Sequence, residues 1–253
     1  MAVMDEFKEE REALKNGTPK EKISYFWYYY KWHVIISIIV IAMVGSFIYQ
    51  FVNRKEDVLT AVMLNASALD QTADLPDFAA DFAQAEGIDL NTESMTFDTS
   101  IRILDDTTMD EVSVTSNQKL MVYVAANELD CMITDLDSIQ KYANSSIFYD
   151  LRDILTEEQC KALEPYFYYV DKEVVLAIEA ANEQADSDYT PVYADPFHPE
   201  EMQDPIPVGI CLTDCKALTD NYYFRGDGIV ISFYANGQHT DTAVDLAEYL
   251  LNN

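Results

Sequence analysis

Residues 34–52 read VIISIIVIAMVGSFIYQFV, an uncharged run of 19 residues in which Gln50 is the only strongly polar side chain. At about 1.5 Å per residue, a helix of this length spans roughly 28 Å, close to the hydrocarbon thickness of a bilayer. A long helix in a soluble protein normally has a polar face, and this run has none. We therefore expect one membrane-spanning helix near the N-terminus.

Aromatic side chains crowd the segment just before this run, where residues 25–33 read YFWYYYKWH. Tryptophan and tyrosine rings favour the headgroup zone of a membrane, and a lysine among them can extend to the phosphates. We therefore predict that Trp27, Lys31 and Trp32 anchor the helix at the membrane surface. Upstream, TPKE at residues 18–21 has the pattern of a capping box with proline at the first helical position, so we expect the helix to begin there.

The flanking cations predict the orientation of this helix. Six Lys or Arg residues precede residue 34, whereas only Arg54 and Lys55 follow residue 52 closely. The positive-inside rule then places the N-terminus in the cytoplasm and the C-terminal part outside the cell. A cleaved signal peptide is disfavoured because its positive region would exceed 30 residues. We expect a cytoplasmic amphipathic segment at 1–22, an aromatic belt with a transmembrane helix at 23–53, and an extracellular acidic domain at 56–253.

Charge separates these parts and excludes one class of function. The 253 residues carry 45 Asp and Glu against 16 Lys and Arg, a formal net charge of −29. From residue 56 onward there are 39 acids and eight bases, a net of −31. Nucleic-acid binding requires cations that displace counterions from phosphates, so this class is excluded. Because 49% of the residues are hydrophobic, a packed core is expected.

Periodicity after residue 56 alternates between strands and helices, which predicts an α/β domain with a largely parallel sheet. The expected strands are 58–64, 94–104, 130–134, 166–178, 207–210 and 228–235. The expected helices are 74–87, 116–127, one capped by Asp135, one opened by the capping box at 156–159, and 240–251. Residues 186–207 hold five of the eight prolines and are expected to form a surface loop.

Two segments carry a resemblance to a known family. NELDCMITD at 127–135, followed by Tyr142 and FYDLRDIL at 148–155, resembles the middle of bacterial extracellular solute-binding proteins of the type 2 periplasmic-binding fold. Residues 228–251 are similar to the closing strand, turn and helix of those proteins, and the aromatic belt is similar to uncharacterised membrane proteins of Firmicutes. The resemblance implies a reduced version of that fold, because those proteins have two lobes and this domain has room for one and a fraction.

The sequence contains few candidate residues for catalysis or binding. Phosphate-loop, nucleophile-elbow and zinc-protease motifs are missing from the sequence, so we expect no enzyme and no cofactor. The aromatic clusters suggest a ligand contact at Tyr168, Tyr169, Tyr222 and Tyr223, with core packing as the alternative. Asp195, His198 and Glu200 suggest weak Ca²⁺ binding, with a solvated acidic loop as the alternative. Cys211 and Cys215 fit a local disulfide, a pair of metal ligands or buried small residues.

Two functions remain open from the sequence. The first is a non-enzymatic extracellular receptor or accessory subunit that binds a small solute or peptide. The second is a structural or assembly component that binds other proteins of a membrane or cell-envelope complex. In both readings the lipid bilayer is a partner and nucleic acid is not. A deep cleft lined by the two tyrosine clusters would favour the first, whereas a flat apolar patch would favour the second.

Overall fold

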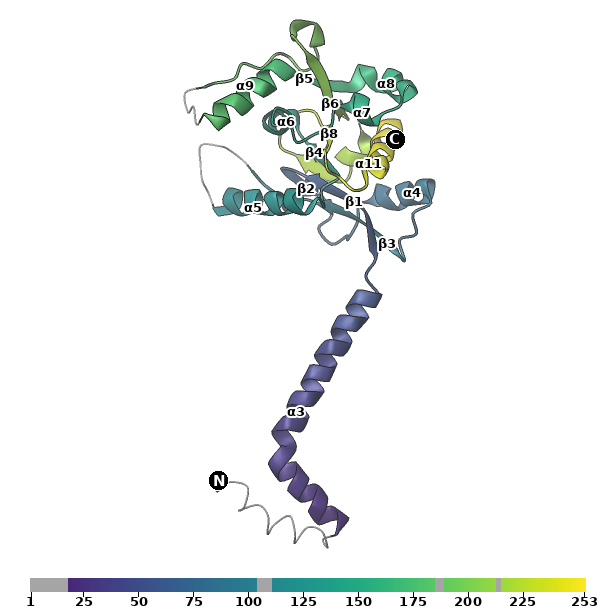
Figure 1. The fold of residues 1–253 in the computed structure, drawn as a ribbon. Helices are drawn as coiled ribbons and strands as arrows, with labels where there is room; N and C mark the ends of the chain where they lie inside the picture. The colour runs from purple at the N-terminus through teal and green to yellow at the C-terminus, as the bar shows by residue number, and fades with distance from the viewer. Residues whose placement is uncertain (1–17, 104–110, 185–188, 213–214) are drawn as a thin grey trace. The chain divides into compact units, whose positions relative to one another are not determined.

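The structure is a computed structural model that describes residues 18–103, 111–184, 189–212 and 215–253. Its first unit contains helix α3, which runs from Pro19 to Val52 (Figure 1). Lys22 N donates to Thr18 O at 3.1 Å, so the helix begins where the capping pattern predicted and continues unbroken. Residues 1–17 of the expected amphipathic segment lie outside the described residues.

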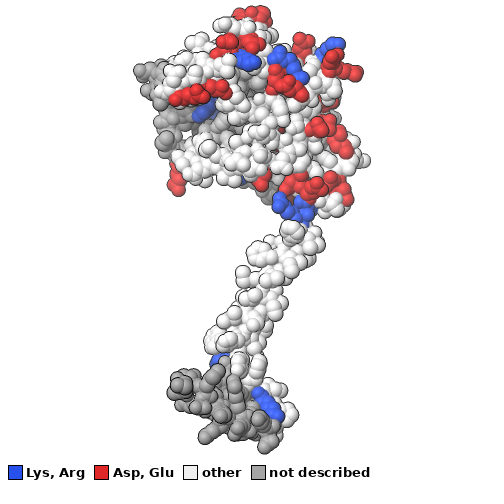
Figure 2. Space-filling view, viewed as in Figure 1, with Lys and Arg blue, Asp and Glu red and all other residues white. Residues whose placement is uncertain are grey.

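The apolar part of α3 is long enough to cross a membrane. Tyr30–Val52 comprises 23 residues with a mean hydropathy of 2.3, and none of it is buried within the protein. Figure 2 shows this stretch as a column without charged side chains beyond its aromatic end. Trp27 and Trp32 are exposed and Lys31 is half-buried on the first half of the helix. The helix thus has the length and composition expected for a membrane span.

The second unit, Lys55–Asn253, is an α/β domain built on a mixed six-stranded sheet of order β3-β1-β4-β8-β6-β5. In that order the strands are Glu93–Asp98, Glu56–Met63, Cys131–Thr134, Val230–Phe233, Pro205–Cys211 and Phe167–Asp171. The helices of this unit are α4 (Asp77–Glu86), α5 (Glu111–Ala126), α6 (Leu136–Ala143), α7 (Leu151–Ile154), α8 (Glu157–Leu163), α9 (Lys172–Glu183), α10 (Lys216–Thr219) and α11 (Thr240–Asn252). Short 3₁₀ turns occur at Glu164–Tyr166 and Pro199–Glu201.

Helices cover both faces of the sheet, as Figure 1 shows for α5, α6 and α9 on one side and α4, α7, α8 and α11 on the other. Strand β1 demonstrates the alternation that separates the two cores. Leu59, Ala61 and Met63 pack with α4 and α11, whereas Val62 packs with α5 and α6. Because side chains of a strand point alternately to opposite faces, the buried part of β1 contributes to both layers.

The expectation of a largely parallel sheet is wrong. Strand β1 pairs in parallel with β3 and β4, but β8 is antiparallel to both β4 and β6, and β5 is antiparallel to β6. Parallel neighbours need a connection that crosses to the opposite end of the sheet. The chain between β6 and β8 instead returns at the same end, where Leu212 N donates to Ile229 O at 2.7 Å.

The expected strand at 166–178 is also wrong beyond Asp171. Helix α9 begins at Lys172, because the Asp171 carboxylate accepts hydrogen bonds from Glu173 N, Gln203 N and Asp204 N. Its side chain therefore caps the helix and ties it to the segment that leads into β6.

Two other boundaries differ from the expected ones. Helix α4 begins at Asp77 after Pro76, later than the expected start at residue 74. Gly87 ends it at the expected position, in the left-handed region (φ 73°). Strand β3 ends at Asp98, whose carboxylate accepts from Ser100 N at 2.9 Å in a turn. Such local side-chain bonds compete with continued strand pairing, so the expected strand over 94–104 stops early.

A second, two-stranded sheet stands beside the carboxyl end of β1. Strand β2 (Ala66–Ala68) pairs antiparallel with β7 (Tyr222–Phe224). Between β1 and β2, Asn65 adopts a positive φ of 59°, and its side chain bonds both Ile103 N and Ile103 O at 2.8 and 3.0 Å. Asn65 therefore fixes the chain that leaves β3 next to the chain that leaves β1.

Candidate functional site

A groove of about 690 Å³ lies at the carboxyl ends of β1 and β3. Three segments line it. Residues within 68–77 begin at the end of β2, residues within 97–102 begin near the end of β3, and residues 220–222 reach the start of β7. In open α/β sheets, ligands commonly bind outside the carboxyl ends of the strands. The volume lies in the range of pockets for small molecules.

Asn221 holds two walls of the groove together. Its backbone oxygen accepts from Leu69 N at 2.9 Å, and its side-chain Oδ1 accepts from Asp77 N at 3.0 Å. Its Nδ2 donates to Ala217 O at 2.9 Å. Asn221 thus supplies the cap that Pro76, with no hydroxyl or carboxyl, cannot give to α4.

Arg102 is the cationic side chain of the groove. Its Nη2 donates to Ser67 Oγ at 3.1 Å, and its backbone N–H donates to Ser116 Oγ of α5 at 3.0 Å. The ion pairs among the described residues do not include Arg102. Because a guanidinium carries five N–H donors, most of its hydrogen-bonding capacity is open to a ligand.

Four aspartates, Asp70, Asp74, Asp77 and Asp220, line the same groove. Hydrogen bonds from the side chain and backbone of Thr72 lower the pKa of Asp70, so this carboxylate is ionised at neutral pH and already engaged. With one arginine against four aspartates, the groove favours a ligand with positive charge.

Asp98 and Lys119 fasten the chain below the groove to α5. Lys119 Nζ lies 2.6 Å from both Asp98 Oδ2 and Ser100 Oγ, and Tyr123 Oη donates to Asp98 Oδ2 at 2.9 Å. Burial alone would raise the pKa of Asp98, but the hydrogen bonds from Lys119, Ser100 and Tyr123 lower it overall. Burial and the bond to Asp98 raise the pKa of Tyr123 to about 12.

The four candidate tyrosines do not meet in one place. Tyr222 is buried and lines the groove, whereas its neighbour Tyr223 is 61% exposed on the other side of β7. Tyr168 and Tyr169 lie on β5, where they border a separate cavity of about 10 Å³. That space holds no more than one water. Burial raises the pKa of Tyr168 and of Tyr222, as expected for packed side chains.

The acidic loop forms a turn without a metal cage. His198 Nδ1 lies 2.9 Å from Glu200 Oε1, and Asp195 Oδ1 accepts from Phe197 N at 2.9 Å. His198 and Glu200 are exposed, and their contact raises the pKa of His198 and lowers that of Glu200. No group of three or more His, Cys, Asp or Glu suited to a metal occurs in the described part of the chain.

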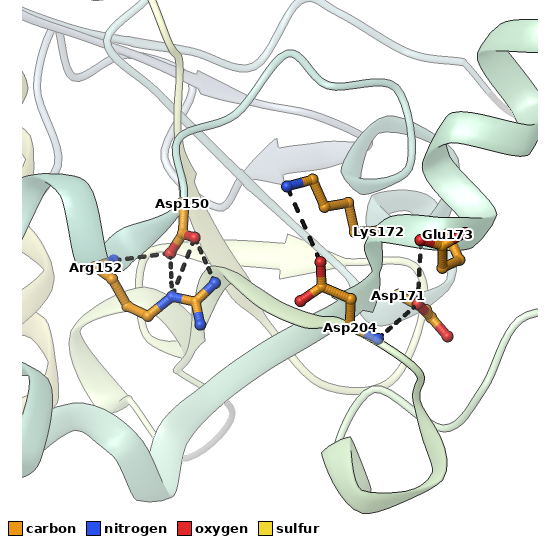
Figure 3. Close-up of polar contacts among 6 residues, drawn as sticks. All are labelled: Asp150, Arg152, Asp171, Lys172, Glu173 and Asp204. Atoms are coloured by element: carbon orange, nitrogen blue, oxygen red, sulfur yellow. Dashed lines mark hydrogen bonds and ion pairs between the residues drawn. The ribbon is translucent and has the colours of Figure 1, made fainter.

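A polar cluster near β5 and β6 is engaged internally, as Figure 3 shows. Arg152 forms a bidentate ion pair with Asp150, in which Nε donates to Oδ1 at 2.8 Å and Nη2 donates to Oδ2 at 2.6 Å. Lys172 Nζ lies 4.0 Å from Asp204 Oδ2. The guanidinium of Arg152 is thus paired with the carboxylate of Asp150, whereas Arg102 has no such partner among the described residues. We therefore assign the Arg152 cluster a structural role.

None of the four cysteines is in a disulfide: Cys131 and Cys215 are buried, and Cys160 and Cys211 are partly exposed. The interpretation of these residues as buried small side chains thus holds for two of them. A bridge between Cys211 and Cys215 is not formed.

Sequence reasoning missed Arg102, Asn221 and the groove aspartates as site residues. One feature of the sequence could have pointed to Arg102: it is one of only eight Lys or Arg residues after residue 55. No sequence feature pointed to Asn221, because its partners Leu69 and Asp77 lie about 150 residues earlier in the chain.

Comparisons with protein-family models, with curated proteins and with solved structures found no match to this chain.

Proposed function

We propose that this chain is a membrane-anchored, non-enzymatic binding protein for a small polar solute. The observation that carries this proposal is the groove of about 690 Å³ at the carboxyl ends of β1 and β3, with open polar groups on its walls. The resemblance of residues 127–155 and 228–251 to solute-binding proteins supports the same class. Helix α3 provides the tether, because it is apolar and long enough to cross a bilayer.

The proposal includes an orientation, with the N-terminus in the cytoplasm and the domain outside the cell. Its support is the excess of cations before the apolar run, six against Arg54 and Lys55. A protease added to intact cells should digest a C-terminal epitope tag. A tag that survives until the cells are lysed would contradict this orientation.

Binding is tested by calorimetry of the full-length protein in lipid nanodiscs, with millimolar amino acids, peptides, sugars or Ca²⁺. A ligand at 100 times its Kd should stabilise the domain by about 2.7 kcal/mol and raise its Tm accordingly. Ala73, an exposed residue on the groove wall, allows a blocking variant, Ala73→Trp. Ala162→Trp on exposed α8 is the matched control. No shift with any probe, or an equal shift in Ala73→Trp, would count against the groove.

A second candidate function, an assembly component, is favoured by the exposed face of α5. Val114, Met121 and Val122 are 41%, 71% and 63% exposed and lie within about 100° of one another around the helix, away from the buried Ser113, Ser116 and Leu120. Apolar side chains gathered on one exposed face often mark protein contacts. A photocrosslinker at position 121 in intact cells should then give one discrete adduct, and one at exposed position 137 should give none. Absence of an adduct at 121 would leave solute binding as the remaining function.

A further inference from the structure

Arg102 of the groove forms no ion pair with a described residue, and its guanidinium narrows the class of ligand that the groove can bind. Arg102 uses one N–H for Ser67 Oγ, and no carboxylate of the described residues lies within 4.0 Å of it as an ion pair. The planar fork of a guanidinium matches a carboxylate or a phosphate with two parallel hydrogen bonds. Arg152, which has Asp150 in this geometry, shows what such pairing looks like in this domain (Figure 3).

The acidic residues around Arg102 favour a carboxylate over a phosphate as the group that it binds. Asp70, Asp74, Asp77 and Asp220 line the same groove, so its net charge with Arg102 is −3. Like charges at short range disfavour a phosphate dianion more than a singly charged carboxylate. The groove therefore favours a ligand that brings a carboxylate to Arg102 together with several positive charges for the aspartates.

Size and apolar lining restrict the ligand further. A volume of about 690 Å³ suits a molecule of several residues rather than a single ion. Leu69, Leu75 and Phe97 lie among the polar lining residues. Such side chains can cover the methylene stems of long cationic side chains, whose charged ends remain near carboxylates.

We propose that the groove binds a short basic peptide with a free carboxyl terminus. Its carboxylate pairs with Arg102, and its side-chain cations lie along Asp74, Asp77 and Asp220. This inference rests on the proposed solute-binding function and names the ligand class for the same site. Polyamines, which lack the carboxylate, and acidic peptides, which lack the cations, fit the groove less well.

The experiment uses full-length protein in nanodiscs of neutral lipid and isothermal titration calorimetry with trilysine, trilysine amide and triglutamate. Trilysine should bind, its amide should bind about tenfold more weakly, and triglutamate should not bind, because one charge-assisted pair is lost or repulsion dominates. Arg102→Gln should weaken trilysine about tenfold and abolish its advantage over the amide. Asp74→Asn and Asp220→Asn should weaken both basic peptides equally.

Matched controls lie outside the groove. Lys161→Gln and Asp137→Asn change exposed charges on α8 and α6 and should leave trilysine binding unchanged. Arg102→Lys keeps the charge without the fork, so its affinity should fall between those of the native protein and Arg102→Gln. Far-UV circular dichroism shows whether each variant remains folded.

The results separate the two proposals. Equal affinity of the native protein for trilysine and its amide would overturn the carboxylate contact at Arg102. Binding of triglutamate or a neutral sugar, abolished by Ala73→Trp, would overturn the basic-peptide ligand but retain solute binding in the groove. Failure of every solute in the calorimetric screen, these peptides included, would overturn both.

Discussion

Asp130 provides the sharpest test of how this domain is held together. Its side chain is 1% exposed, and three N–H groups converge on it. Oδ1 accepts from His239 N at 2.8 Å, while Oδ2 accepts from Thr60 N at 2.8 Å and lies 3.1 Å from His239 Nδ1. The carboxylate thereby joins β1 to the start of α11, so we predict that Asp130→Asn strongly destabilises the domain.

The magnitude follows from counting acceptors. Asparagine has one oxygen, so in either orientation its NH₂ faces a backbone N–H of Thr60 or His239. An unsatisfied buried donor costs about 1–3 kcal/mol, and loss of the negative charge weakens the remaining bonds by about 1 kcal/mol. We therefore expect a loss of about 2–4 kcal/mol in the free energy of unfolding. His239→Ala removes only the ring contact and should cost less than about 1 kcal/mol.

The assay is urea unfolding of the full-length protein in nanodiscs, followed by near-UV circular dichroism of the tyrosines. Tryptophan fluorescence would not report on this domain, because both tryptophans, Trp27 and Trp32, lie in α3. With a slope of about 2 kcal/mol/M, the midpoint should fall by about 1–2 M. Asp137→Asn, at an exposed position, is the control. A loss below about 1 kcal/mol for Asp130→Asn, or equal losses for Asp130→Asn and His239→Ala, would refute this reasoning.

Three further predictions use the same unfolding assay. Asn221→Ala removes the cap of α4 at Asp77 N and should cost about 1–2 kcal/mol; an unchanged midpoint would contradict it. Burial, and to a smaller extent neighbouring acids, raise the pKa of Asp245, so its ionisation opposes folding as pH rises. Asp245→Asn should therefore add about 0.5 kcal/mol to the free energy of unfolding at pH 7, and this gain should vanish below about pH 4. The pKa of Asp98 is lowered because its hydrogen bonds, above all that from Lys119, outweigh the effect of burial. Asp98→Asn should therefore lower the free energy of unfolding by about 1–2 kcal/mol at pH 7. This loss should shrink at pH 3, below the pKa of about 3.9 that an aspartate has in the unfolded chain. A gain for Asp245→Asn that persists below pH 4, or a cost for Asp98→Asn that grows at pH 3, would contradict the shifts.

Local signals in the sequence predicted the elements that depend on neighbouring residues. Thr156 and Gln159 form both hydrogen bonds of the expected capping box, Asp135 caps α6 through Ser138 N, and Gly87 ends α4. Helix α3 begins at the residue that the proline pattern indicated. Each of these features spans at most four residues, so no knowledge of tertiary contacts was required.

Strand direction could not be predicted in this way. Whether β8 runs with or against β4 depends on which end of the sheet the preceding connection reaches, and no local pattern encodes that. Asp171 was placed inside a strand because its capping partners include Gln203 N and Asp204 N, about 30 residues further along the chain. The pattern of apolar residues after Asp171 is compatible with a strand and with a helix.

Adjacency of aromatic residues misled the search for a binding site for a related reason. In a strand, consecutive side chains point to opposite faces, so a pair such as Tyr222 and Tyr223 places only one ring in any given groove. Tyr222 is accordingly buried against the groove while Tyr223 is exposed. Arg102 contacts β2 through Ser67, which lies 35 residues earlier in the chain, and sequence spacing does not reveal this contact.

The acidity of the α/β domain gains a physical role if the groove binds a basic peptide. Acidic side chains are spread over its visible face (Figure 2), with 39 acids against eight bases after residue 55. A field of one sign raises the encounter rate of oppositely charged ligands, and salt screens it. The association rate of trilysine should therefore fall steeply as ionic strength rises, whereas its dissociation rate should change less. An uncharged solute would gain nothing from this field, so a salt-independent association rate would argue that the charge of this domain serves another purpose.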